Sequence, residues 1–219
     1  MQTAAILLSG GMDSGVLLAW ARQRFGRLVA LSFDYGSKHG VKEQAMAERL
    51  AAAYEAEYVR VELPFINELF VSSLLQSGSA IPDGPYAESN LSSTVVPFRN
   101  GIMLSIAAGY AESHGLDCLL IASHAGDHPV YPDCRPEFDG AMCAAIKLGT
   151  TTGVNLLAPF AHLSKAEIAA TGRALNFDFR ATWSCYKGLD KHCGTCATCL
   201  ERKQALDHAA GLDPTEYLE

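Results

Sequence analysis

The chain has 219 residues, of which 49% are apolar and 19% charged, which suits one globular domain with at most a small appendage and argues against disorder. The formal net charge of −7 argues against a protein that grips the nucleic-acid backbone. No apolar stretch is long enough for a signal peptide or a membrane span. From the charge we expect no nucleic-acid partner, and from the lack of a long apolar stretch we expect no membrane partner.

Short apolar runs alternate with helical patterns along the chain. We predict strands at residues 3–8, 28–33, 57–63, 118–122 and 154–157. Helices are predicted after residue 14, in the first half of 64–97, and at 42–54, 100–113, 137–148, 164–175 and 199–210, with loops at 78–85 and 124–136. Ser164 and Glu167 form a capping-box pattern. This alternation predicts a doubly wound, mostly parallel α/β sheet of five strands over residues 1–179, followed by an extension over 180–219.

The segment Ser9-Gly10-Gly11-Met12-Asp13-Ser14 joins the first predicted strand to the first predicted helix. Two glycines let the backbone approach a ligand closely, and the helix offers free N–H groups and the positive end of its dipole to an anion. The sequence contains neither a dinucleotide fingerprint nor a Walker loop here. The segment therefore predicts a phosphate-binding loop, with a plain glycine turn as the alternative.

Four of the seven cysteines, Cys185, Cys193, Cys196 and Cys199, are clustered near the end of the chain. An odd total and a cluster of thiols fit the reducing cytoplasm, where such cysteines bind metal more often than they form disulfides. Four thiolates suit a closed, structural Zn²⁺ site. An iron–sulfur cluster or a redox pair of Cys193 and Cys196 remains as an alternative.

Three polar segments, at 34–39, 96–100 and 126–138, follow predicted strands or open a predicted helix. In a parallel sheet they meet the phosphate loop at the carboxyl edge, where ligands bind. Solvated loops, or an Arg–Asp pair that holds loops together, are the alternatives.

The string Ser-Gly-Gly-x-Asp-Ser resembles the pyrophosphate loop of the N-type ATP pyrophosphatases, the PP-loop superfamily with an adenine nucleotide alpha hydrolase-like fold. With the other motifs, the chain resembles the QueC family of 7-cyano-7-deazaguanine synthases. The matching strings span nearly the whole chain and lie at 9–14, 34–36 with His39, 99–100, 131–138, 165–168, 182–188 and 192–199.

This resemblance implies a cytoplasmic, homodimeric ligase that uses ATP, Mg²⁺, 7-carboxy-7-deazaguanine and ammonia, with a structural Zn²⁺ on the four cysteines. The acid and then the amide are adenylated, and the product is a nitrile. The implied ATP-binding residues are Leu8, Ser9, Gly10, Gly11, Asp13, Ser14, Ser32 and Phe33. The implied catalytic residues are Asp13, Ser14, His39, Arg99 and Lys165. The implied substrate residues are Tyr35, Lys38, Arg99, Asn100, Asp127, Asp133 and Arg135.

Each residue type suits its implied task. Loop amides and Lys165 can offset charge on the pyrophosphate, while Arg99 or Arg135 can fork onto the carboxylate or the α-phosphate. Asp133 can accept hydrogen bonds from the guanine-like edge, and Tyr35 can stack on a planar ring. His39 or Asp127 is a candidate proton acceptor for ammonia.

Two positions depart from the family pattern. Ser37-Lys38 stands where many relatives have Gln-Arg, and Phe98 stands where many have Gly and is expected to add bulk beside the substrate pocket. These departures leave open a QueC-like enzyme that stops at the amide or transfers the acid to another amine, including a protein amine, as in antiphage defence. A zinc-stabilised nucleotide-binding module without turnover is a third hypothesis.

Overall fold

The computed structural model describes residues 1–85, 92–129 and 131–218. The predicted connection at 64–97, the segment at 126–138 and the extension at 180–219 therefore each include residues outside the described ones, namely 86–91, Val130 and Glu219. Five strands form one sheet in the order β3-β2-β1-β4-β5, and every neighbouring pair is parallel. The strands are β1 (Thr3–Leu7), β2 (Arg27–Asp34), β3 (Glu57–Glu62), β4 (Cys118–Leu120) and β5 (Asn155–Leu157). The predicted doubly wound α/β sheet is confirmed.

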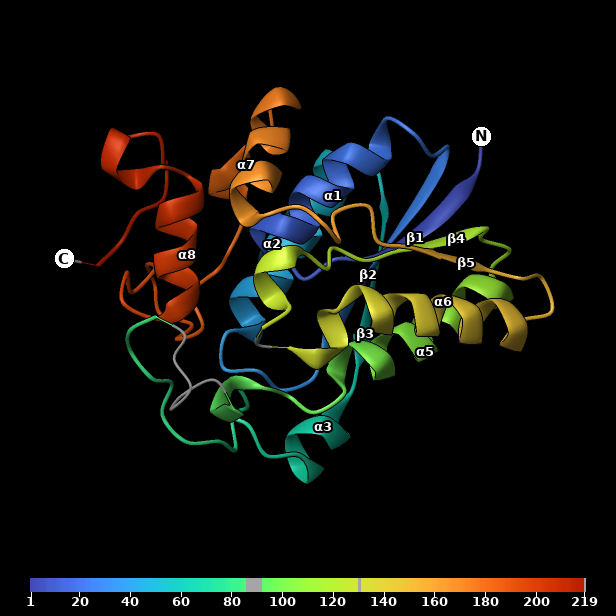
Figure 1. Cartoon of the computed structure of the whole chain (residues 1–219), viewed down its shortest axis with the longest axis horizontal. Helices are drawn as coiled ribbons and strands as arrows, with labels where there is room; N and C mark the ends of the chain where they lie inside the picture. The colour runs from blue at the N-terminus through green and yellow to red at the C-terminus, as the bar shows by residue number, and fades with distance from the viewer. Residues whose placement is uncertain (86–91, 130, 219) are drawn as a thin grey trace.

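Helices cover both faces of this sheet (Figure 1). They are α1 (Met12–Arg22), α2 (Gly40–Ala53), α3 (Pro64–Leu69), α5 (Arg99–Ser113), α6 (Pro136–Gly149), α7 (Lys165–Ala174) and α8 (Ala197–Ala205). The central strand β1 alternates its side chains between two cores: Ala4 and Ile6 pack in the core with α1, α2 and α7, whereas Ala5 packs in the core with α5. Because both faces are covered, the inner strands β1, β2 and β4 are buried over most of their length, whereas the edge strand β3 carries charged residues and is largely exposed.

The ends of two helices show how local chemistry sets their length. The Ser164 hydroxyl accepts a hydrogen bond from the backbone N–H of Glu167, and the Glu167 carboxylate accepts one from the backbone N–H of Ser164, so the predicted capping box is present at α7. The last helix was predicted to reach residue 210, which is wrong. It ends at Ala205, because Asp207 adopts a left-handed conformation with φ 57° that interrupts the α-helix before a 3₁₀ turn at His208–Ala210.

The strand order creates a crevice at one edge of the sheet. From β1 the chain builds outward through β2 and β3, and it then crosses back to place β4 and β5 on the other side of β1. The connections that leave the carboxyl ends of β1 and β4 therefore diverge, and ligands of doubly wound sheets bind at such a switch point. The phosphate loop follows β1, and the polar segment at 126–138 follows β4.

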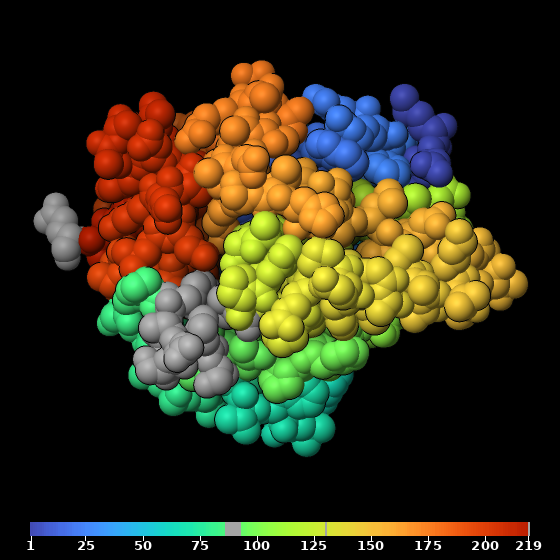
Figure 2. Space-filling view, in the orientation of Figure 1, coloured from blue at the N-terminus to red at the C-terminus, as the bar shows by residue number. Residues whose placement is uncertain are grey.

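The C-terminal segment packs against the main sheet domain beside α7 (Figures 1 and 2). Arg202 of α8 is almost fully buried, and its guanidinium donates to the Phe179 carbonyl at 2.7 Å and to the Thr182 hydroxyl at 2.8 Å. The bond to Phe179 crosses the predicted boundary after residue 179, whereas the bond to Thr182 lies within the predicted extension, and a division of the chain there stays a prediction. Among the described residues, no helix is long and apolar enough to cross a membrane.

Candidate active site

A pocket lies at the switch point and is lined by elements from the whole length of the chain. Its walls come from the phosphate loop, β2, α2, α5, the segment after β4, α7 and the C-terminal extension. Of the predicted site residues outside the cysteine cluster, those that line it are Leu8, Ser9, Gly11, Asp13, Ser14, Phe33, Tyr35, His39, Arg99, Asn100, Asp127 and Lys165. Gly10, Ser32, Lys38, Asp133 and Arg135 are not among the lining residues.

The phosphate loop is held open at the start of α1. Gly10 has φ 83°, and a Cβ there would overlap the carbonyl oxygen of Glu43 in α2, so only glycine fits. The hydroxyls of Ser9 and Ser14 lie 3.0 Å apart. Within the described residues no side chain caps α1 at Gly11, which leaves the N–H groups of its first turn directed at the pocket for an anion.

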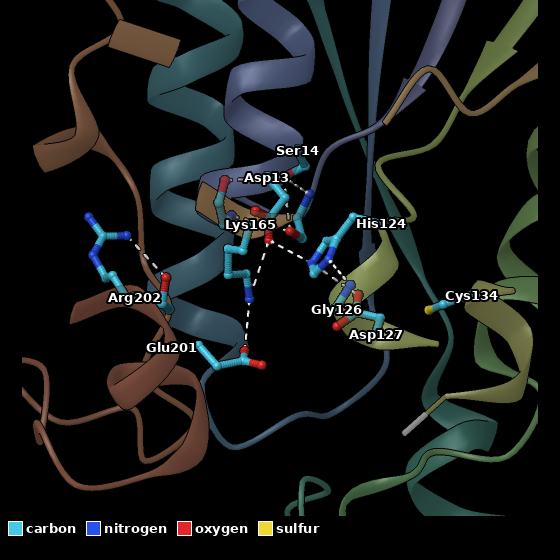
Figure 3. A network of polar contacts seen from close by, with 12 residues as sticks. Asp13, Ser14, His124, Gly126, Asp127, Cys134, Lys165, Glu201 and Arg202 are labelled. Atoms are coloured by element: carbon cyan, nitrogen blue, oxygen red, sulfur yellow. Dashed lines mark hydrogen bonds and ion pairs between the residues drawn. The ribbon is translucent and has the colours of Figure 1, made fainter. Parts of the chain in front are cut away.

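A charged network surrounds Asp13 (Figure 3). The Lys165 ammonium lies 3.7 Å from the Asp13 carboxylate and 2.9 Å from that of Glu201. On the other side, Nε2 of His124 lies 3.6 Å from the Asp13 carboxylate and 3.3 Å from that of Asp127. Nδ1 of His124 accepts the Gly126 N–H at 3.1 Å, so the neutral ring carries its proton on Nε2, facing both carboxylates.

The pKa shifts in this network follow from burial and from the neighbouring charges. Burial alone would raise the pKa of Asp13, but Lys165 and His124 lower it well below its usual range. Burial would lower the pKa of Lys165, but Asp13 and Glu201 raise it, so this cation stays charged beside the phosphate loop. Sequence reasoning missed His124 and Glu201. Asp127, three residues after His124, was a local signal for the histidine, but nothing near Glu201 in the sequence indicates Lys165 as its partner.

Arg99, at the start of α5, presents a second cation to the pocket. Its Nη1 lies 3.5 Å from the Tyr35 hydroxyl, and its guanidinium carbon lies 6.0 Å from the centre of the Tyr35 ring. Among the described residues, no carboxylate forms an ion pair with this guanidinium. An arginine that faces a pocket without an acidic partner can receive an anion from outside.

Asp133 does not line the pocket; it hydrogen-bonds the residue that follows Arg99. Its carboxylate accepts the backbone N–H of Asn100 at 2.8 Å, and its backbone carbonyl accepts the Asn100 side-chain amide at 2.9 Å. These bonds cap the first turn of α5 and so hold Arg99, the residue before Asn100, at the pocket wall.

Three further expectations differ from the structure. Lys38 was expected at the substrate, but its ammonium donates to the backbone carbonyls of Ser73, Gly78 and Ser79 and so holds that loop. Arg135 is exposed and donates to the His128 carbonyl at 3.0 Å, so of the two candidate arginines only Arg99 lines the pocket. Phe98 was expected beside the pocket, but its side chain is 57% exposed and packs edge-on against Phe138.

An unpredicted carboxyl group, that of Glu43, lines the pocket from α2. Its Oε2 lies 3.5 Å from Nε2 of His39, whose Nδ1 lies 3.2 Å from the Tyr186 carbonyl. Burial raises the pKa of Glu43 to about 8, although Arg99 opposes this. Burial also lowers the pKa of His39 to about 4. A glutamate in the first turn of a helix is common, so the sequence alone did not single it out.

The four clustered cysteines meet in space. Their sulfur atoms all lie within 4.8 Å of one another, all four side chains are buried, and the sulfurs of Cys193 and Cys199 are 3.8 Å apart. Four thiolates around tetrahedral Zn²⁺, with Zn–S bonds of about 2.3 Å, place their sulfurs about 3.8 Å apart. Backbone N–H groups of Thr195 and Cys196 also donate to the Cys193 sulfur, as around metal-bound thiolates. The donor set therefore fits a tetrahedral metal.

This cluster lies directly behind the pocket. Ser184, Tyr186, Thr198 and Glu201 line the pocket and come from the same segment as the cysteines. The backbone N–H of Trp183 also donates to the Gly10 carbonyl at 2.9 Å. Folding of the cysteine segment therefore completes one wall of the pocket.

A parallel doubly wound sheet with a Ser-Gly-Gly-x-Asp-Ser loop after its first strand defines the PP-loop class of nucleotide-binding folds. Solved structures share this fold at low sequence identity. The U34-tRNA thiolase NcsA from Methanococcus maripaludis has a TM-score of 0.54 and 15% identity, over 97% of this chain and 68% of that one. A 4-thiouridine synthetase, solved with RNA and ATP, has a TM-score of 0.51 and 18% identity, over 97% of this chain and 52% of that one.

Comparison of the sequence is more specific. The family described as "Queuosine biosynthesis protein QueC" matches residues 3–210. Proteins named 7-cyano-7-deazaguanine synthase are 54% identical in Desulfotalea psychrophila, over 100% of both chains, and 44% identical in Methanoregula boonei, over 98% of both. A third, from Porphyromonas gingivalis, is 51% identical over 97% of this chain and 96% of that protein. This chain belongs to the QueC family, and the resemblance drawn from its motifs is confirmed.

Proposed function

We propose that this protein is an ATP-dependent carbon–nitrogen ligase of queuosine biosynthesis that converts 7-carboxy-7-deazaguanine and ammonia to 7-cyano-7-deazaguanine. Its relatives over the full chain are named for that product. The observation that carries the proposal is the pocket itself. It has a loop suited to an anion, with Lys165 on one wall and, on another, the guanidinium of Arg99, which pairs with no carboxylate of the described residues, so it suits a triphosphate and a carboxylate together.

In the first half-reaction, an oxygen of the substrate carboxylate attacks the α-phosphorus of ATP and pyrophosphate leaves. N–H groups at the start of α1 and the Lys165 ammonium stabilise the negative charge of the leaving group. Arg99 holds the carboxylate until it attacks, with its guanidinium steadied by Tyr35. Ammonia then forms the C–N bond, AMP leaves, and the amide results.

In the second half-reaction, the amide oxygen attacks the α-phosphorus of another ATP. The amide nitrogen then loses its protons as AMP departs with the former carbonyl oxygen, and the nitrile remains. Mg²⁺, when bound, neutralises phosphate charge. Among the described residues, Asp13 Oδ1 is buried without a hydrogen-bond partner, which suits a cation ligand, and the four cysteines would hold a structural Zn²⁺.

The product's mass tests this proposal. Purified protein with ATP, Mg²⁺, ammonium and the acid should give the nitrile and AMP. Lys165→Met should abolish AMP formation, while Lys147→Met, at an exposed position of α6, should leave it unchanged. An amide or a heavier conjugate as the sole product would favour the alternative enzyme, which stops at the amide or transfers the acid to another amine. Absence of AMP with every amine would indicate a nucleotide-binding module without turnover. The homodimer implied by the family is tested by sedimentation of the same sample.

A further inference from the structure

The wall of the pocket formed by α2 carries a carboxyl group to which the reaction above gives no role. The Glu43 side chain is 19% exposed. Its backbone lies directly against the phosphate loop, because the Glu43 carbonyl occupies the space of a Cβ at Gly10. Arg99 also lies close enough to influence the Glu43 carboxyl. Glu43 therefore lies on the wall between the expected sites of the triphosphate and of the substrate carboxylate.

Hydrogen bonding defines what Glu43 faces. The Tyr186 carbonyl can only accept a hydrogen bond, so Nδ1 of His39 must carry a proton. In the neutral ring, Nε2 then presents a lone pair toward the Glu43 carboxyl at 3.5 Å. The other ionisable groups that face Glu43 are Tyr35 from the segment after β2 and Arg99 from α5. A carboxyl group in these surroundings holds its proton at neutral pH and releases it a little above, near the pH at which a general base works best.

The other carboxylates of the pocket already have a lysine or histidine partner. Asp13 and Glu201 pair with Lys165, and Asp127 lies against His124. Among the described residues, Glu43 forms no ion pair with a lysine or an arginine. A carboxylate stabilised by a nearby cation is a weak base, so Glu43 is better suited than Asp13 to accept a proton.

We propose that Glu43 is the general base that removes protons from the substrate nitrogen in both half-reactions. This inference rests on the proposed function and deepens it. After ammonia forms the C–N bond, the C–O bond to AMP breaks, AMP leaves with the electron pair, and the surplus proton on nitrogen passes to Glu43. In the adenylated amide, Glu43 takes the N–H protons in turn, returning each to solvent. The electrons of the last N–H bond form the third C–N bond as the C–O bond to AMP breaks. One base serves both steps because all these protons leave the same nitrogen.

The test compares Glu43→Gln with wild type in two assays. Exchange of labelled pyrophosphate into ATP, with the acid but no ammonium, measures adenylation alone. Nitrile formation at a constant concentration of free ammonia measures the full reaction. We expect Glu43→Gln to keep exchange within about twofold and to lose nitrile turnover by about 10²–10⁴-fold. Wild-type turnover should rise with pH through about 8, and the variant should lack this rise. Glu48→Gln, at an exposed position of the same helix, should match wild type in both assays.

Two results would overturn the role of Glu43: nitrile turnover by Glu43→Gln within about threefold of wild type with the same pH profile, or an equal loss of exchange and turnover. If Glu43→Gln does not fold, Glu43→Asp takes its place, and it should keep the pH-dependent rise at reduced turnover; loss of the rise in that variant counts against the proposal. Absence of exchange in the wild type would instead refute the proposed function, and with it this inference, so the two failures are told apart by the protein in which they occur.

Discussion

Replacement of Gly10 by alanine should destabilise the protein strongly. Gly10 has φ 83°, and this left-handed conformation costs an alanine about 1–2 kcal/mol. The new Cβ would also overlap the Glu43 carbonyl and lie 2.9 Å from the Ala47 nitrogen. Both atoms belong to the backbone of α2, so the helix must move, and overpacking of this kind costs about 1–3 kcal/mol. The sum is about 2–5 kcal/mol.

Thermal unfolding measures this effect. In a domain of this size, 1 kcal/mol shifts Tm by about 2–4 °C, so Gly10→Ala should lower Tm by about 4–20 °C. Gly109→Ala is the matched control: position 109 is exposed in the middle of α5, and a Cβ there meets no described atom within 4 Å. This control should gain up to about 1 kcal/mol from helix propensity. A Tm for Gly10→Ala equal to that of wild type would refute the packing of α2 against the phosphate loop.

Four further predictions follow from the site. Arg99→Ala should raise the KM for the acid at least tenfold, whereas Arg135→Ala should leave it near wild type, as steady-state kinetics will measure. Asp133→Ala leaves a buried N–H without its acceptor and should cost about 1–3 kcal/mol in urea unfolding. Metal chelation should lower Tm and activity together, because the cysteine segment forms a wall of the pocket. Because the folded state raises the pKa of Glu43 from 4.5 to about 8, folding binds a proton between these values. Stability should therefore fall as pH rises through that range, and less so in Glu43→Gln when urea midpoints are compared.

Sequence patterns alone placed the strands and helices along the chain and singled out the Ser-Gly-Gly-x-Asp-Ser loop and the four clustered cysteines. These features are local: alternation of apolar runs, two glycines between a strand and a helix, and thiols at short spacing each leave a pattern within a few residues. The capping box at Ser164 is of the same kind, since both of its hydrogen bonds lie within one helical turn. The predicted end of α8 was wrong because a single residue in a left-handed conformation, Asp207, leaves only a weak signal in the sequence.

Which side chains meet in the pocket became visible only in the folded chain. His124, Glu201 and Glu43 come from segments far apart in the chain. Each has a neighbour that sequence spacing does not reveal: Asp13 for His124, Lys165 for Glu201, and Arg99 for Glu43. Conversely, Lys38 and Arg135 are motif residues that hydrogen-bond backbone carbonyls and do not line the pocket. Charge and hydrogen-bonding capacity are written in the sequence, but burial and distance, which set pKa and availability, arise only when the chain is folded.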